Sequence, residues 1–167
     1  MTYAKQLSDS LEDYLEAIFH IEAHKQAARA KDIADRLTVS SSSVTGALRL
    51  LADRGLVNYA PYDIITLTPA GKAVAQEIVH RHQMLRAFFV RILGIAEPAA
   101  EEAACKMEHG ISPLVLERMT EFIKFLESCP LSDPRWIQRF RLFCIQGTIP
   151  DQCHACGAAQ ENSEAQA

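Results

Sequence analysis

The sequence predicts a mainly α-helical protein: an N-terminal winged helix-turn-helix, then an all-helical domain, then a short segment rich in cysteine. Two patterns predict this class. Two short amphipathic stretches around a tight turn lead into a hairpin pattern, and apolar residues with a period of about 3.6 dominate the chain after residue 68. The expected boundaries are 1–72 for the winged domain, 73–128 for the helical domain, 129–157 for the Cys-rich segment and 158–167 for a tail expected to be disordered.

The composition is that of a globular protein. Of 167 residues, 49% are hydrophobic and 23% charged, and the longest apolar stretch, around Met84 to Ala96, contains two arginines that exclude a bilayer span. The N-terminus lacks an apolar signal core, so we expect a cytoplasmic protein with no membrane partner. Five cysteines in that compartment predict reduced thiols. The net charge of −4 argues against constitutive nucleic-acid binding unless something offsets it.

The first helix is expected to begin after Ser8 or Asp9 and to end near His24, because both residues cap helices and periodic apolar residues follow them. Asp13 and Glu16 lie three apart on the flank of this helix. Acidic residues in early turns usually complement the helix dipole, so these two side chains alone do not predict a binding site.

A helix-turn-helix is expected next, with helices at Ala30–Leu37 and Ser41–Arg54, a turn through Thr38 and Val39, and Gly55 as the stop. The leading end of the second helix is small and polar, as it is where such a helix meets base edges in the major groove. A serine run at a helix start is also ordinary capping. The predicted DNA-binding residues are Lys31, Ser40, Ser42, Ser43, Thr45, Gly46 and Arg49. Lys31 is expected to contact a phosphate.

Two strands, Leu56–Tyr59 and Asp63–Leu67, are expected to complete the wing. A long helix from Pro69 to Gly94 follows, then one within Glu101–Ser112 and one that opens at Pro113. Their apolar faces are wide and have no sheet to cover. This indicates a subunit interface, and therefore a homodimer that would supply two recognition helices to DNA.

The segment Glu101–Ser112 contains residue types that bind metals. If it is helical throughout, Cys105, Glu108 and His109 stand at i, i+3 and i+4 and share one face. A thiolate, a carboxylate and an imidazole suit Fe(II), Mn(II) or Zn(II) better than calcium or magnesium. The alternative is two solvated helix residues beside a small buried cysteine.

A second group of metal-binding residues lies near the C-terminus. Cys129, Cys144, Cys153 and Cys156 fall within some thirty residues, and the last two form a Cys-x-x-Cys knuckle. Four thiolates would hold Zn(II) or an iron–sulfur cluster. In the alternative, Cys129 and Cys144 are core residues and only the Cys153/Cys156 pair is reactive.

Five segments together resemble the metal-dependent transcriptional regulators of the diphtheria toxin repressor and manganese transport regulator family. They are SLEDYLEAIF at 10–19, SSSVTGALRLLADRGLV at 41–57, ITLTPAGK at 65–72, HRHQMLRAFF at 80–89 and ACKMEHGIS at 104–112. The resemblance covers about the first 128 residues in order and spacing, which is more specific than any one motif.

The resemblance implies a site for Fe(II) or Mn(II) between the first helix and the dimerisation helices. Asp13 and Glu16 resemble the manganese-sensing branch of the family, and Cys105 the iron-sensing branch. Arg86 and Glu101 stand where the iron branch would have a second-site carboxylate and a histidine. The SH3-like C-terminal domain of longer members is expected to be missing. The implied ligands are Asp13, Glu16, His82, Cys105, Glu108 and His109.

The function expected from these features is a homodimeric, metal-dependent regulator, most simply a repressor, that binds a palindromic double-stranded DNA operator. Without metal, carboxylates on the two domains would repel one another, and a divalent cation would reverse that interaction. Two alternatives are a winged-helix regulator that responds to redox state or an iron–sulfur cluster through the C-terminal cysteines, and a helical metalloenzyme. The chain lacks the paired Glu-x-x-His motifs of a di-iron bundle, so we expect no enzymatic activity.

Overall fold

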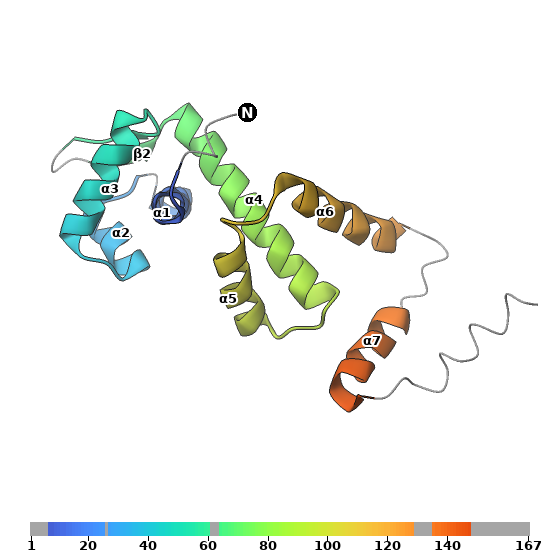
Figure 1. The fold of residues 1–167 in the computed structure, drawn as a ribbon. Coiled ribbons are helices and arrows are strands. Elements are labelled where there is room, and N and C mark those ends of the chain that lie inside the picture. Colours follow the sequence, from blue (N-terminus) through green and yellow to red (C-terminus); the bar gives the residue numbers. More distant parts are fainter. Residues whose placement is uncertain (1–6, 26, 61–63, 129–134, 148–167) are drawn as a thin grey trace, which may run out of the picture. The chain divides into compact units, whose positions relative to one another are not determined.

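The computed structural model describes residues 7–25, 27–60, 64–128 and 135–147 (Figure 1). It confirms the mainly helical class with an N-terminal winged helix-turn-helix. The elements in order are α1 (Asp9–Lys25), α2 (Ala30–Leu37), α3 (Ser41–Asp53), β1 (Val57–Asn58), β2 (Thr66–Leu67), α4 (Pro69–Arg91), α5 (Glu97–Met107), α6 (Pro113–Ser128) and α7 (Arg135–Gln146). The expected tail at 158–167 lies outside the described residues.

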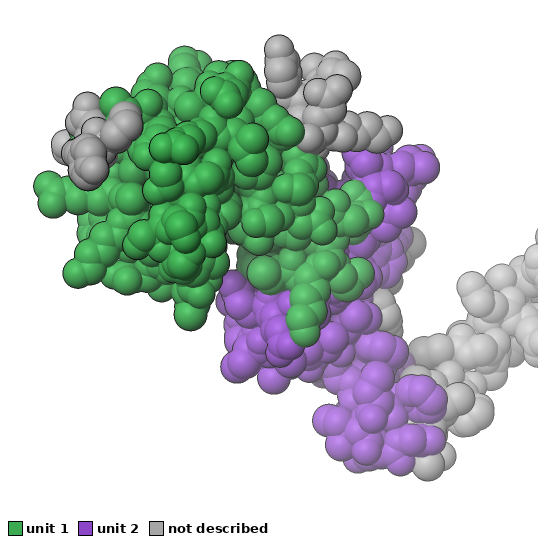
Figure 2. Space-filling model, turned by 60° about the vertical axis from the view of Figure 1, so that its left-hand side comes forward, with its two compact units in different colours: residues 1–83, 104–111 green, residues 84–103, 112–167 purple. Residues whose placement is uncertain are grey.

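The chain forms two compact units, which Figure 2 shows in different colours. Unit 1 comprises residues 1–83 and 104–111, and unit 2 comprises residues 84–103 and 112–167. Helices α4 and α5 each contribute residues to both units. No helix among the described residues is long and apolar enough to cross a membrane.

Unit 1 is built around a hydrophobic core that α1, α2, α3, the strands and the first turns of α4 share. Leu15 of α1, Ile33 of α2 and Leu48 of α3 are completely buried in this core, and so is Ile78 of α4. Each fully buried side chain of this size contributes about 1.5–3 kcal/mol relative to an exposed one. The position of α1 is therefore fixed by the same core that holds the helix-turn-helix.

The turn between α2 and α3 is set by local backbone and side-chain chemistry. Thr38 ends α2 in the left-handed region at φ 56°, and its N–H bonds to the carbonyl of Ala34. Ser40 then caps α3, because its hydroxyl oxygen accepts from the Ser43 N–H at 3.1 Å. The predicted helix-turn-helix is present, and α3 ends at Asp53, one residue before the predicted end.

The wing is shorter than predicted. Strands β1 and β2 pair antiparallel over two residues each, with Val57 opposite Leu67 and Asn58 opposite Thr66. Ile65 does not extend this ladder, because it forms a separate bridge with Ala28. The Leu56 carbonyl accepts from the Thr68 N–H at 3.0 Å, which leads the chain into α4.

Helix α4 begins as the sequence predicts. The hydroxyl of Thr68 accepts from the Gly71 N–H at 3.0 Å and donates to the Gly55 carbonyl at 2.7 Å. A Cβ at Gly71 would lie 1.8 Å from the Leu56 carbonyl oxygen, so only glycine allows this close contact between helix and wing.

Unit 2 contains the second half of α4, most of α5, and the helices α6 and α7. Phe88 of α4 contacts Phe122 of α6 with ring centroids 6.3 Å apart. Helix α7, for which the sequence predicted no element, is held by Arg141, which donates to the carbonyls of Val90 and Arg91 at 2.9 and 2.6 Å. This guanidinium caps the C-terminal end of α4. Large apolar side chains remain exposed on α6 and α7, including Leu114, Phe125 and Ile145.

Candidate metal centre

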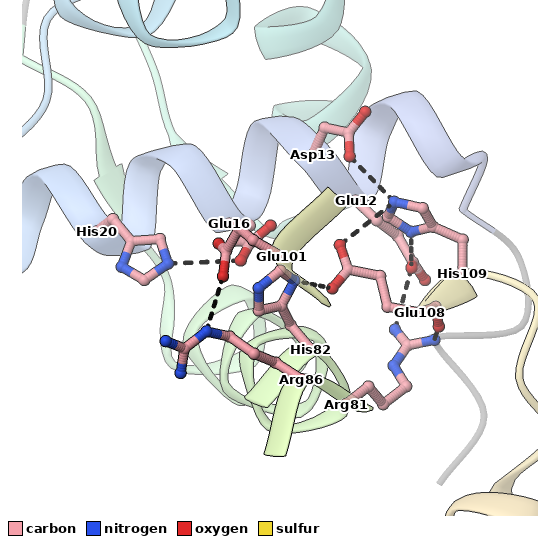
Figure 3. A network of polar contacts seen from close by, with 10 residues as sticks. All are labelled: Glu12, Asp13, Glu16, His20, Arg81, His82, Arg86, Glu101, Glu108 and His109. Atoms are coloured by element: carbon pink, nitrogen blue, oxygen red, sulfur yellow. Dashed lines mark hydrogen bonds and ion pairs between the residues drawn. The ribbon is translucent and has the colours of Figure 1, made fainter. Parts of the chain in front are cut away.

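Three elements of unit 1 bring oxygen and nitrogen side chains together (Figure 3). Asp13 and Glu16 come from α1, His82 comes from α4, and Glu108 and His109 come from the turn after α5. Glu108 is completely buried, and the His109 side chain is 9% exposed. Five of the six residues in the ligand set that the resemblance implies are thus neighbours in space.

The helical face predicted for Cys105, Glu108 and His109 is wrong, because the helix ends before the last two residues. Helix α5 ends at Met107, so these two residues do not continue the helical face of Cys105. The Glu108 N–H still bonds to the Ala104 carbonyl at 2.9 Å, after which the Ile111 N–H bonds back to the Met107 carbonyl at 3.1 Å. Gly110, a poor helix former, and Pro113, which disfavours helical geometry at the residue before it, follow in the sequence.

Cys105 is exposed on α5 and does not belong to either cluster of candidate ligands that the described residues form. Those clusters are Asp13–Glu108–His109 and Glu16–His82–Glu108. In each cluster one potential ligand atom per residue lies within 4.8 Å of the others. Glu108 belongs to both clusters, so its carboxylate is the centre of the arrangement.

Histidine nitrogens lie between the carboxylates. Nε2 of His109 is 3.0 Å from Oδ1 of Asp13 and 3.5 Å from Oε1 of Glu108. Nδ1 of His82 is 2.8 Å from Oε2 of Glu108. Imidazole rings thus lie beside the Glu108 carboxylate, while the charge of Glu16 still acts unfavourably on the charged form of Glu108.

The environment favours the protonated forms of these groups when no cation is bound. Burial, reinforced by the charge of Glu16, raises the pKa of Glu108 to about 7, although His82 and His109 oppose the rise. Burial also raises the pKa of Asp13 against the opposing effect of His109. Burial lowers the pKa of His109, but its hydrogen bond to Glu12 and the charges of Asp13 and Glu108 outweigh this, so the net shift is upward.

These residues fit a divalent transition-metal ion. Oε1 of Glu108 is buried and has no hydrogen-bond partner among the described residues, which would be costly in the absence of a ligand. A cation would satisfy this oxygen. Carboxylate and imidazole donors in combination suit Mn(II), Fe(II) or Zn(II).

Two further residues, Glu12 and Arg81, contact the cluster and were not among the predicted site residues. Oε2 of Glu12 is 2.8 Å from Nδ1 of His109 and 3.0 Å from a terminal nitrogen of Arg81. Arg81 also donates to the Glu108 carbonyl oxygen at 3.1 Å. A signal was available: Glu12 stands three residues before the buried Leu15, so a charged residue interrupts an apolar stripe.

In unit 2, the positions implied for a second iron-type site form an ion pair instead. Nε of Arg86 lies 3.0 Å from Oε2 of Glu101, and the same guanidinium bonds to Glu97. Of the proposed cysteine site only Cys144 is described, and it is exposed on α7. Cys129, Cys153 and Cys156 lie outside the described residues.

Helix α3 presents most of the predicted DNA-contacting residues to the surface. Ser42, Ser43, Gly46 and Arg49 are exposed, whereas Thr45 is half-buried and its hydroxyl donates to the Ser41 carbonyl at 2.9 Å. Ser40, which precedes α3, and Lys31, which stands on α2, are exposed as well. The Ser40 hydroxyl lies 2.8 Å from those of Ser42 and Ser43, so Ser40 both caps the helix and stands at the surface beside these two exposed serines.

Two family models match this chain. Residues 6–64 match the N-terminal DNA-binding domain of the iron-dependent repressors, and residues 68–137 match their metal-binding and dimerisation domain. The two matches together include α1–α6, and every residue of the candidate metal centre lies within them.

Named relatives and a solved structure agree with these matches. The chain is 39% identical to an uncharacterised helix-turn-helix-type transcriptional regulator of Methanocaldococcus jannaschii, over 71% of this chain and 95% of that protein. It is 35% identical to the regulator MntR of Bacillus pumilus, over 77% of this chain and 87% of that one. A solved manganese-dependent transcriptional repressor in complex with manganese is 30% identical with a TM-score of 0.64, over 69% of this chain and 53% of that chain. The present chain thus spans about half the length of that solved repressor.

Proposed function

We propose, from the premise that this chain belongs to the iron-dependent repressor family of metal-dependent, DNA-binding transcriptional regulators, that it represses transcription when Mn(II) or Fe(II) occupies the Glu108 cluster. The ligands for Mn(II) would be Asp13, Glu16, His82, Glu108 and His109. The observation that carries the proposal is the buried Oε1 of Glu108, which lacks a hydrogen-bond partner among the described residues and lies 3.5 Å from Nε2 of His109.

Cys105 is proposed as a ligand for Fe(II) rather than Mn(II). It lies three residues before Glu108 on the last turns of α5, and a thiolate is the softer ligand. Mn(II) would instead be bound by the carboxylates and imidazoles alone. The two ions would thus use different subsets of the same residues.

The coupling of metal to DNA would pass through α1. Asp13 and Glu16 stand on this helix, while its opposite face carries Leu15 and Ile18 into the core that supports α3. A cation that joins these carboxylates to His82 and Glu108 would therefore hold the helix-turn-helix in one position relative to α4 and the turn after α5. Because such coupling is reciprocal, operator DNA would also tighten metal binding.

The proposed partner is a palindromic double-stranded DNA operator, bound by a homodimer. The exposed residues of α3 would enter the major groove, with Lys31 on a phosphate. The domain at 73–128 would dimerise, and the exposed apolar side chains of α6 support this assignment. Two chains would then present two recognition helices to two half-sites.

A second metal site is proposed at Cys129, Cys144, Cys153 and Cys156, for Zn(II) or an iron–sulfur cluster. Its support is the spacing of the cysteines. Protein purified without oxygen should contain one tightly held zinc per chain or show iron–sulfur absorption, and Cys153→Ser should abolish either signal. Free thiols at all four positions of metal-replete protein would exclude this site.

The main proposal is tested by Mn(II)-dependent retardation of a DNA duplex selected from a random library by the wild-type protein. Glu108→Ala and His109→Ala should lose the Mn(II)-dependent shift while the protein remains folded, whereas Glu77→Ala, an exposed acid on α4, should behave as wild type. Tight binding of the selected duplex in the presence of EDTA would contradict the proposal.

A further inference from the structure

Glu12 and Arg81 form a buried ion pair at the edge of the ligand cluster, and neither belongs to a group of candidate ligands. Their side chains are 5% and 12% exposed, respectively. We propose that this pair is a positioning device for the metal site: it orients His109 so that Nε2 is the metal ligand, and it holds Glu108 in place through the backbone. This inference rests on the proposed function.

The orientation of His109 follows from its two ring nitrogens. Nε2 faces the proposed ligands Asp13 and Glu108, whereas Nδ1 faces Oε2 of Glu12 at 2.8 Å. A metal-binding histidine almost always donates its other ring N–H to a carboxylate, a carbonyl or water, which fixes the tautomer and the ring plane. Glu12 is therefore the acceptor for Nδ1–H, and Nε2 is left for the cation.

Arg81 connects this acceptor to the second central ligand. One terminal nitrogen of the guanidinium lies 3.0 Å from the same Oε2 of Glu12, and the other donates to the Glu108 carbonyl at 3.1 Å. A planar guanidinium can hold two acceptors in a fixed relation, which the point charge of a lysine cannot do. Arg81 thus ties α1 to the turn after α5.

The sequence positions of both residues argue against a chance surface pair. Arg81 lies three residues after Ile78 and four before Leu85, both completely buried, so it stands on the apolar stripe of α4. Removing two charges from water is costly, and hydrophobic residues of similar size would often serve the fold equally well. The contacts to His109 and Glu108 supply a reason for the charged pair.

The test measures Mn(II) affinity by competition with a fluorescent chelator, together with urea unfolding of the metal-free protein. The double variant Glu12→Leu/Arg81→Met removes both charges, so it should fold with near wild-type stability. Its Mn(II) affinity should nevertheless fall about 10- to 100-fold. Wild-type affinity in a folded double variant would overturn the proposal.

Two single variants test the individual contacts. Glu12→Gln keeps an oxygen that can accept from Nδ1–H, so it should lose less affinity than Glu12→Ala, and equal losses would overturn the assigned role of the acceptor. In the Zn(II)-loaded wild type, nitrogen NMR of His109 should show a protonated Nδ1 and a metal-bound Nε2. Metal bound at Nδ1 would also contradict the proposal.

Two controls separate this inference from the proposed function. Asp32→Ala breaks another ion pair of unit 1, to Lys25 at 2.7 Å, and should leave Mn(II) affinity unchanged. Glu108→Ala should abolish Mn(II) binding. If Glu108→Ala binds Mn(II) normally, the proposed site itself is wrong. If only Glu108→Ala loses affinity and the double variant does not, the site stands and the positioning role of Glu12 and Arg81 fails.

Discussion

Oε2 of Glu108 lies 2.8 Å from Nδ1 of His82, and the carboxylate that makes this contact is completely buried. The same carboxylate approaches His109 with its other oxygen, at 3.5 Å. A side chain in this position must neutralise its charge by a proton or by a cation. Protons and a metal ion should therefore compete for the Glu108 carboxylate.

The first prediction concerns the pH dependence of the stability of metal-free protein. The pKa of Glu108 is raised from 4.5 to about 7, so between these values the folded chain holds a proton that the unfolded chain has lost. The free energy of unfolding should then decrease as pH rises through this window, by on the order of 3 kcal/mol. The raised pKa values of Asp13 and His109 act in the same direction.

Urea unfolding in EDTA at several pH values measures this slope. Glu108→Gln, which mimics the protonated carboxyl, should have a much shallower slope than wild type. Added Mn(II) should stabilise the wild type more at high pH than at low pH, because the ligands must be deprotonated to bind. A wild-type slope in Glu108→Gln would mean that this carboxyl does not hold the proton.

The second prediction is that Asp13→Ala separates metal binding from switching. The substitution removes one member of the Asp13–Glu108–His109 group, and leaves the Glu16–His82–Glu108 group with all its members. The Asp13 side chain is 41% exposed, so the fold should be little affected. Calorimetric titration should still detect Mn(II) binding, at reduced stoichiometry or affinity, while Mn(II) no longer promotes DNA binding. A metal response equal to wild type would reduce Asp13 to a helix-dipole partner.

The third prediction is that Arg49 reads the operator. Arg49 is exposed on α3, one turn after Gly46. Arg49→Ala should weaken binding of the selected duplex by about 1–3 kcal/mol if the guanidinium contacts a base bidentately, with little loss on unrelated duplexes. Lys124→Ala, which removes one positive charge from the exposed surface of α6, is the matched control. Uniform losses on all duplexes would instead identify Arg49 as a phosphate contact.

The parts of the fold that local chemistry determines were predictable from the sequence. Pro69 indicated the start of α4 and the serine run indicated the start of α3, and the structure places the caps at Thr68 and Ser40. The second strand of the wing was predicted too long. Ile65 is a residue type that favours strands, yet it pairs with Ala28, which is far away in sequence. Strand propensity and hydrophobic periodicity do not indicate which distant residue a strand residue pairs with.

The candidate site was predictable in its residue types but not in its connections. Glu108 and His109 were selected for their chemistry, but their predicted helical face assumed that α5 continues past Met107. Glu12 and Arg81 were overlooked because their role exists only when α1, α4 and the turn after α5 meet. A charged residue on an apolar stripe is the signal that should be read in such cases.

The last prediction concerns Gly46, which stands in the middle of α3 although glycine is a poor helix former. A Cβ at this position would meet nothing within 4 Å, so neither the fold of the chain nor its packing explains the glycine. Alanine should stabilise the helix by about 1 kcal/mol and raise the melting temperature by roughly 2–4 °C.

If α3 enters the major groove, however, the added methyl group would keep the helix from its closest approach to the bases. Gly46→Ala should therefore be more stable than wild type and bind the selected duplex more weakly at saturating Mn(II), with unchanged Mn(II) affinity. Increased stability with wild-type DNA affinity would show that the helix does not approach DNA at this residue.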